Sequence, residues 1–489
     1  MMESKSIVSS FIWKFLERGA AQVFALIVQI VLARLLAPDD FGVLAVLLVF
    51  INLSNVLIQK GFATALVQKD YIEDIDVNSV FWISELIAAF LYILLWCFAP
   101  LLENVYGTLH LASYLRIISI SLFAGAFYSI ENSLLIRNMQ FKKMFFSSFA
   151  ATLIAGTLAM VLAYKGLGCW ALIWQNIVQQ IFLSVFSFPF CRWKIKIQCS
   201  KKSFFEVFRF GSNVLLAELL YTGVENLRTL IIGARYSSTD LAYYDRGQTY
   251  PSVAMRSIYD TVGSVLLPIF SREQNNTIGL RQSAQKAIGF SFFLIAPCFT
   301  GFAAIAEPFT RLLLTDKWLP CVPYMRLFCV YQLGILPYCV LRNILYATGK
   351  SKNCLFLELF KSVLSLGAVV IGMLINPLAI AFLSTLAVWL ATVAYGVTIH
   401  KFLHFDLKEL LIDFLQIVMY CVIMTTAILI VDDLISSLVF KIVTEIITGV
   451  AVYIALSVLT HSKYYIEGLN ILMKSLERMR GKNIECGKK

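Results

Sequence analysis

The residues that can do chemistry in this chain are polar and charged side chains set inside long apolar stretches. The stretch 12–36 carries Lys14 and Arg18 one helical turn apart, and Gln22 and Gln29 continue the same polar stripe. A charged group at the bilayer centre costs at least about 2.5–3.5 kcal/mol on insertion scales, so it usually faces a wet cavity or an opposite charge. Lys14 and Arg18 therefore either line a cavity or lie at the cytoplasmic interface and extend to the head groups.

A second polar stripe lies in the apolar stretch 207–233. Its members Glu218, Tyr221, Glu225 and Arg228 are three or four residues apart, which places them on one face of a helix. A structural salt bridge is one interpretation and a cavity lined by charge is the other. The guanidinium fork matches phosphate oxygens, and a buried glutamate can carry a coupling proton or sodium ion.

The next stretch, 240–270, carries Arg246, Arg256 and Asp260. Arg256 and Asp260 are four residues apart and can neutralise each other within one helix. Arg246 lies near a predicted helix end, where anchoring at the interface explains it as well as substrate binding does.

Polar residues also follow one face of the stretch 41–66, where Asn52, Asn55 and Gln59 are joined by Lys60 near the helix end. The spacing of two other pairs of opposite charge, three or four residues apart, predicts ion pairs within one helix: Glu358 with Lys361, and Lys441 with Glu445. The sequence thus indicates two groups of candidate site residues, cations for substrate binding and acids for ion coupling: Lys14, Arg18, Lys60, Arg228, Arg246 and Arg256, and Glu218, Glu225 and Asp260.

Enzyme and metal motifs are missing from the sequence. It has no P-loop, no H-E-x-x-H zinc motif and no G-x-S-x-G nucleophile motif, and no C-x-x-C pair occurs among its eleven cysteines. We therefore expect no enzyme activity, no metal site and no bound cofactor, and an ion gradient of H⁺ or Na⁺ as the energy source.

The elements that must hold these side chains are membrane-spanning helices. Of the 489 residues, 59% are apolar and 15% charged, whereas soluble domains have about 25% charged residues. Stretches of about 20 apolar residues, the length of one span, recur along the chain. We predict an all-α integral membrane protein of about fourteen spans, at 12–36, 41–66, 78–101, 110–133, 145–164, 167–190, 207–233, 240–270, 287–306, 322–347, 354–375, 377–399, 411–431 and 436–460.

The distribution of Lys and Arg orients these spans. With the N-terminus inside, the cytoplasmic segments hold 25 of the 41 basic residues and the outer loops hold 4. This bias predicts that both termini are cytoplasmic. The net charge of +11 then reflects mainly the excess of Lys and Arg in the cytoplasmic segments. The short basic tail is expected to contact lipid head groups rather than nucleic acid.

A weak internal repeat divides the predicted spans. ARLLAPDDFG at 33–42 and ARYSSTDLA at 234–242 both lead from an Arg at a helix end, through a polar turn with a capping Asp, into the next helix. A second similarity lies after the fourth span of each half, where an apolar helix end is followed by lysines: Lys142 and Lys143 in the first half, and Lys350 and Lys352 in the second. We predict a six-helix bundle over 1–200, a second over 201–405, and two extra helices with a basic tail over 406–489, with a cavity between the two bundles.

Several strings resemble the polysaccharide transporter family of the multidrug/oligosaccharidyl-lipid/polysaccharide flippase superfamily. They are LARLLAPDDFG at 32–42, GFATALVQ at 61–68, RTLIIG at 228–233, LAYYDRG at 241–247 and LLP at 266–268. The likeness covers roughly 10–460 and is strongest to flippases of the Wzx type. Many family members carry Asp where Arg228 stands, so an acidic role does not transfer to that position.

This resemblance implies a flippase in a bacterial inner membrane. Its substrate would be an oligosaccharide on a polyprenyl diphosphate, moved from the cytoplasmic to the outer leaflet by alternating access, and a polymerase and chain-length proteins would be possible partners. Three alternatives stay open: a peptidoglycan-precursor flippase, a drug exporter of the same superfamily, and a membrane polysaccharide polymerase.

Overall fold

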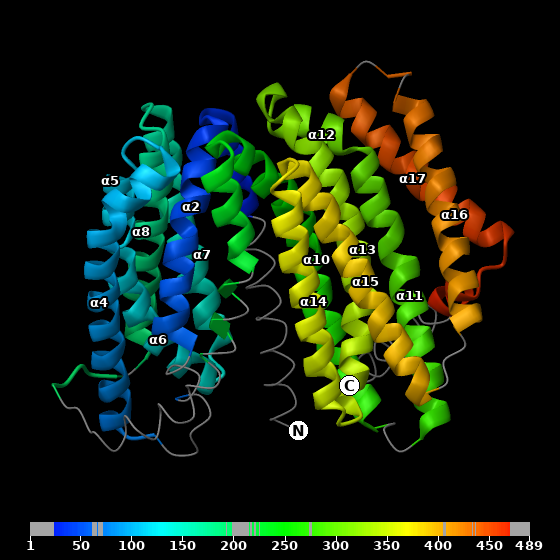
Figure 1. Ribbon diagram of the computed structural model, residues 1–489, viewed down its shortest axis with the longest axis horizontal. Helices are drawn as coiled ribbons and strands as arrows, with labels where there is room; N and C mark the ends of the chain where they lie inside the picture. The colour runs from blue at the N-terminus through cyan, green and yellow to red at the C-terminus, as the bar shows by residue number, and fades with distance from the viewer. Residues whose placement is uncertain are drawn as a thin grey trace, which may run out of the picture. The chain divides into compact units, whose positions relative to one another are not determined.

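The computed structural model describes residues 24–60, 66, 72–191, 193–197, 215, 218–219, 222–223, 225–272, 276–403, 407–432, 434–435 and 437–469. Within these residues the regular structure is helical, with no β-strand (Figure 1). Contacts between Cα atoms divide the chain into two compact units, Met1–Asp245 and Arg246–Lys489. The predicted all-α fold class is confirmed.

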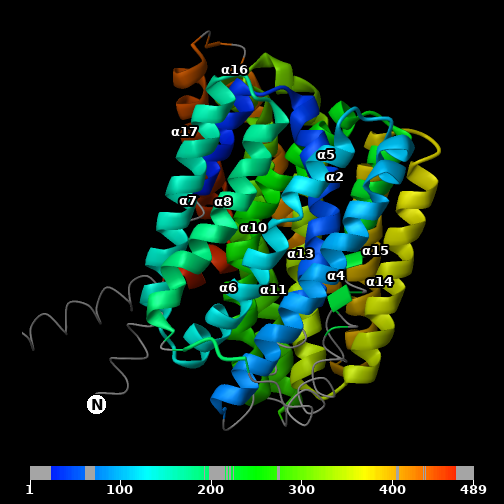
Figure 2. The same ribbon diagram turned by 90° about the vertical axis from the view of Figure 1, so that its left-hand side faces the viewer.

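Unit 1 is a bundle of long helices (Figure 2). Its first described element is the apolar helix Phe24–Leu35. The elements that follow are α2 (Pro38–Asn55), η1 (Val56–Lys60), α4 (Asp74–Tyr106), α5 (Leu111–Ile118), α6 (Ser121–Arg137), α7 (Phe141–Tyr164), α8 (Cys169–Ser187) and η2 (Phe188–Phe190).

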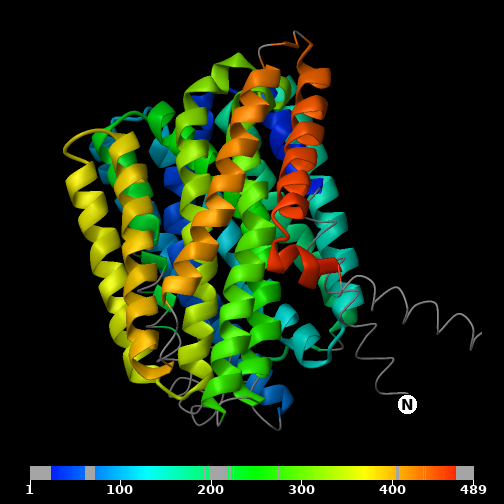
Figure 3. The same ribbon diagram turned by 90° about the vertical axis from the view of Figure 1, so that its right-hand side faces the viewer.

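The long helix α10 (Ser238–Arg272) carries the division between the units, and unit 2 continues from it (Figure 3). Its further elements are α11 (Thr277–Ala304), α12 (Ala306–Leu313), η3 (Asp316–Cys321), α13 (Val322–Ala347), α14 (Ser351–Gly372), α15 (Pro377–Leu403), α16 (Leu407–Asp432) and α17 (Leu438–Leu459).

The two units pair their helices in the same order. In unit 1, α4 packs on α6, and α6 and α7 both pack on α8. In unit 2, α11 packs on α13, and α13 and α14 both pack on α15. The predicted repeat is thus visible in the packing of each unit, while the predicted bundle boundaries after residues 200 and 405 stay predictions.

Eleven helices in the described part of the chain are long and apolar enough to cross a membrane. They coincide with eleven of the fourteen predicted spans. Of the other three, 12–36 and 207–233 are described only in part, and 240–270 falls in α10, whose charged residues lower its hydropathy. The total of fourteen therefore stays a prediction. One predicted span, 110–133, is broken between α5 and α6, where Ser121 Oγ donates to the Ile118 carbonyl at 2.6 Å.

The predicted capping aspartates are confirmed in both copies of the first repeat. Asp40 Oδ2 accepts the Ala37 N–H at 3.1 Å at the start of α2. Asp240 Oδ2 accepts the Ser237 N–H at 3.3 Å at the start of α10. Each carboxylate satisfies a backbone donor that the first helical turn leaves open and lies at the positive end of the helix dipole.

The second pair of repeated helix ends also has one geometry. After α6, the Gln140 N–H donates to the Leu135 carbonyl at 2.9 Å, and after α13 the Lys350 N–H donates to the Leu345 carbonyl at 2.9 Å. The residue before each donor has a positive φ, 50° at Met139 and 70° at Gly349. Leu135 and Leu345 therefore occupy matching positions. Counting from them aligns each residue of α6 with one residue of α13.

Residues 225–245 belong to unit 1 because they pack tightly on α2 and α4. A Cβ on Gly42 would overlap the Ser238 carbonyl, and one on Gly233 would lie 2.9 Å from a Val46 methyl. The Tyr106 hydroxyl donates to the Leu230 carbonyl at 3.3 Å. Small residues at these positions let the backbones approach closely, as in other membrane helix contacts.

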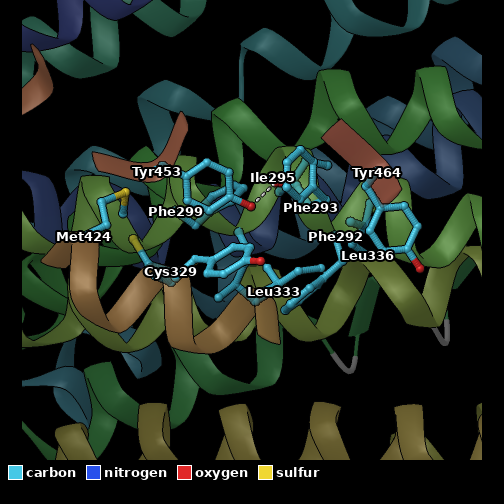
Figure 4. Packing of buried hydrophobic residues seen from close by; sticks show 14 of the residues in the cluster. Phe292, Phe293, Ile295, Phe299, Cys329, Leu333, Leu336, Met424, Tyr453 and Tyr464 are labelled. Atoms are coloured by element: carbon cyan, nitrogen blue, oxygen red, sulfur yellow. Dashed lines mark hydrogen bonds between the residues drawn. The ribbon is translucent and has the colours of Figure 1, made fainter. Parts of the chain in front are cut away.

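Helices α16 and α17 join unit 2 through an aromatic core (Figure 4). The Tyr453 hydroxyl of α17 donates to the Phe293 carbonyl of α11 at 2.7 Å. Phe292 of α11 stacks on Phe414 of α16 with ring centroids 3.8 Å apart. The predicted extra helices therefore pack on α11.

A cap substitution tests the repeated turn. We expect Asp40→Ala and Asp240→Ala each to lower the free energy of unfolding by about 1 kcal/mol, the usual effect of losing a helix cap. Asp40→Asn keeps an acceptor oxygen and should lose less. Thermal unfolding of the purified protein in detergent measures the difference. Unchanged stability of both alanine variants would show that the caps contribute nothing.

Candidate functional site

The clearest charged site among the described side chains is the pair Arg228 and Glu225, one turn apart on the helix over 225–235. Arg228 Nη2 lies 3.3 Å from both carboxylate oxygens of Glu225. The Arg228 side chain is 4% exposed and that of Glu225 is 36% exposed. The buried guanidinium is thus neutralised by a carboxylate that reaches the surface of the unit.

Tyr244 of α10 completes this cluster. Its side chain is buried, and its hydroxyl interacts with the Arg228 guanidinium. The guanidinium presents its N–H donors in a planar fork that fits the oxygens of a carboxylate and of a phosphate alike. The cluster can therefore exchange Glu225 for a phosphate oxygen without moving the arginine far.

The predicted polar face of α2 is also present. Gln59 Nε2 donates to Asn55 Oδ1 at 3.3 Å and to the Gly125 carbonyl of α6 at 3.4 Å. The helix widens into the π-turn η1 at this place, a feature that often accompanies functional sites. Gly125 has no side chain, and this leaves room for the two amides.

Arg246 is 7% exposed and lies on α10 close to Cys321, at the end of η3. The next residue, Gly247, faces the Tyr324 side chain so closely that a Cβ would lie 2.4 Å from it. Arg246 is therefore packed inside unit 2 rather than extended to an interface, which favours a role beyond anchoring.

The structure leaves several predicted site residues without a test. Lys14 and Arg18 lie outside the described residues. Lys60 ends η1, and Arg256 and Asp260 lie in α10, but their side chains are outside the described part. Glu218 is described and half-buried. Of the nine candidates, Glu225 and Arg228 are the two that the described contacts bring together.

One charged network was missed by pattern reasoning. Glu358 of α14 was predicted to pair with Lys361, and these side chains do lie 4.0 Å apart. Its carboxylate also accepts a hydrogen bond from Tyr338 of α13 and one from Tyr395 of α15 at 3.2 Å. Arg342 of α13 lies 3.8 Å away.

This network joins α13, α14 and α15 around one carboxylate. Lys361 Nζ also donates to the Tyr338 hydroxyl at 3.3 Å and lies 4.4 Å from the centre of that ring. Two cations and two phenols thus surround Glu358. The spacing of Tyr338 and Arg342 on one helix face was a signal, but nothing in the sequence indicates that they meet α14.

A model of the family "Polysaccharide biosynthesis protein" matches residues 31–323. The chain belongs to this family. This confirms the resemblance to polysaccharide transporters and places the chain in the flippase superfamily. It is a multi-pass membrane protein with bacterial relatives.

Two relatives and one solved structure describe this similarity. The succinoglycan biosynthesis transport protein ExoT of Rhizobium meliloti is 24% identical over 392 residues, which are 80% of this chain and 78% of that protein. The lipopolysaccharide biosynthesis protein WzxC of Escherichia coli is 22% identical over 350 residues, 71% of each chain. The lipid II flippase MurJ, in an inward closed conformation, has a TM-score of 0.70 at 17% identity, with 93% of this chain and 99% of that chain covered. That last likeness shows the fold.

Proposed function

We propose that this protein is a flippase that moves a polyprenyl-diphosphate-linked oligosaccharide from the cytoplasmic to the outer leaflet for surface polysaccharide synthesis, by alternating access. The observation that carries the proposal is a buried arginine cluster inside a membrane-spanning chain of the polysaccharide biosynthesis family. The names of ExoT and WzxC, a transport protein and a lipopolysaccharide biosynthesis protein, support it.

The chemistry of the substrate fits the cluster. A diphosphate carries negative charge through the membrane and needs cationic donors, which Arg228 supplies when Glu225 yields its place. Lys14, Arg18, Lys60, Arg246 and Arg256 are further proposed contacts, and Glu218, Glu225 and Asp260 are proposed coupling acids. The energy source would be a proton or sodium gradient.

The proposal also covers the orientation of the chain in the membrane and the proteins that act after it. Both termini would be cytoplasmic, in accordance with the distribution of basic residues, and the protein would act as a transporter without enzymatic activity. A polysaccharide polymerase and chain-length proteins would receive its product in the outer leaflet.

The second candidate is a peptidoglycan-precursor flippase, which the fold likeness to MurJ favours. The match to a polysaccharide biosynthesis family over 31–323 favours the first candidate. A drug exporter has a fold likeness of the same kind, to a multidrug resistance MATE family transporter with a TM-score of 0.61 at 14% identity, and the family match favours the first candidate over it as well.

Deletion of the gene tests the function. We expect a strain without this protein and without a paralogue to accumulate the lipid-linked oligosaccharide in the inner leaflet and to lose surface polysaccharide. Accessibility of the glycan to an impermeant label measures the leaflet, and complementation with the wild-type chain is the control. Normal surface polysaccharide would contradict the proposal, and an accumulated peptidoglycan precursor would support the second candidate.

A further inference from the structure

A carboxylate outside the cluster described above lies inside unit 1. Glu131 of α6 is 0% exposed and stands in the membrane span Leu111–Arg137. Its Oε2 accepts one hydrogen bond from Ser184 Oγ of α8 at 3.2 Å. Its Oε1 is buried and has no hydrogen-bond partner in the described part of the chain.

No described Lys or Arg lies within salt-bridge distance of Glu131. Among the neighbouring elements, Glu131 acts on the thiol of Cys191, just beyond α8, and Lys143 at the start of α7 acts on the same thiol. Burial raises the pKa of Cys191 to about 12, so this thiol stays neutral. Helix α4, which packs on α6, carries the acids Asp74, Asp76, Glu85 and Glu103, and the side chain of Lys60 is outside the described part.

A buried carboxylate without a counter-charge is costly, so its neutral, protonated form is favoured. Ionisable groups of this kind inside a membrane span usually serve a functional role.

The fold itself does not need an acid at this position. The matching turns after α6 and α13 pair Leu135 with Leu345, and counting back along both helices pairs Glu131 with Leu341. Leu341 is buried in the core of unit 2. Since a leucine satisfies this position in one unit, packing alone does not explain a glutamate in the other.

Polar groups lead away from Glu131 along one face of α8. Gln180, Ser184 and Ser187 are spaced by four and three residues, and Cys191 follows four residues later. Gln180 Oε1 and Ser187 Oγ are buried without a hydrogen-bond partner among the described residues. Cys191 Sγ contacts the carbonyls of Glu131 and Ser187 at 3.6 and 3.4 Å, which places the end of this stripe beside α6.

We infer that Glu131 is a proton-binding site that couples the transport cycle to a proton gradient, with the stripe on α8 as the path for the proton. Uptake forms one O–H bond on a carboxylate oxygen with a proton from water, and release returns it. The coupling role rests on the proposed transport function, whereas proton binding does not.

Infrared difference spectroscopy of the purified protein tests proton binding without any substrate. We expect the wild type to show a carboxylic C=O band that falls as pH rises, and Glu131→Gln to lose the component of that band that Glu131 contributes. Glu103→Gln removes a carboxylate that accepts the Ala112 N–H at 2.8 Å, and should keep the band. A band of Glu131→Gln that is identical to that of the wild type would overturn the assignment.

Transport in vesicles tests the coupling. With the lipid-linked oligosaccharide of the native strain, an imposed proton gradient should accelerate wild-type transport severalfold and leave Glu131→Gln unaffected. Glu131→Leu repeats the residue found in unit 2 and serves if the glutamine variant does not fold. An equal response of both proteins to the gradient, or a response to Na⁺ alone, would overturn the coupling role. Failure of the wild type to transport would count against the proposed function, and the infrared result would still decide proton binding.

Discussion

Arg228→Ala is expected to lower export of the lipid-linked oligosaccharide by roughly tenfold to a hundredfold, the effect of losing one or two charge-assisted hydrogen bonds. The arginine is buried, and its donors are held in place by Glu225 and Tyr244. Arg228→Lys keeps the charge but loses the fork, so we expect partial export. Restoration of surface polysaccharide in a deletion strain measures the effect, at matched levels of membrane-inserted protein.

Two controls separate substrate binding from folding at this site. Arg235→Ala removes an exposed arginine from the end of the same helix and should complement the deletion fully. Arg228→Ala combined with Glu225→Gln removes the carboxylate that the single variant leaves unpaired, so it should regain stability without regaining export. If the single variant exports normally, Arg228 does not contact the substrate.

Glu358→Ala is expected to give the largest loss of stability, about 2–3 kcal/mol, because it removes the acceptor shared by two phenols and two cations. The side chains of Arg342 and Lys361 are 26% and 17% exposed, so they cannot turn fully to water. Thermal unfolding of the purified protein in detergent measures the loss. Glu358→Gln keeps an acceptor oxygen for the tyrosines and should be destabilised less.

The corresponding positions of unit 1 suggest uncharged replacements for the charged residues of this network. The register that pairs Leu135 with Leu345 places Asn132, Ser148 and Ala151 at the positions of Arg342, Glu358 and Lys361. A triple variant with Arg342→Asn, Glu358→Ser and Lys361→Ala removes all three charges together and should unfold at a higher temperature than Glu358→Ala. If the alanine variant is as stable as the wild type, the network does not hold α13, α14 and α15 together.

Much of the fold could be predicted from the sequence because apolar length is a local property. Eleven predicted spans coincide with eleven long apolar helices, and the capping roles of Asp40 and Asp240 followed from residue types at helix starts. The pair Glu225 and Arg228 was also predictable, since a spacing of three residues brings two side chains together on one helix.

Contacts between different helices could not be predicted from hydropathy or from spacing within one helix. Glu131 is flanked in the sequence by Ser129, Asn132 and Ser133, whereas its hydrogen-bond partner Ser184 is on another helix. In the same way, Glu358 was paired correctly with Lys361, but Tyr338, Tyr395 and Arg342 come from α13 and α15. Which faces of two helices meet is decided by packing over the whole unit.

The sequence by itself determined an all-helical membrane protein, the places of most of its spans and a repeated pair of turns, because hydropathy and capping act within one segment. Only the tertiary structure decided which polar side chains are buried together. It paired Arg228 with Tyr244, gathered four side chains around Glu358 and enclosed Glu131 without a counter-charge. The physical reason is that a buried charge depends on neighbours brought from distant parts of the chain, and these neighbours determine whether it forms an ion pair or holds a proton.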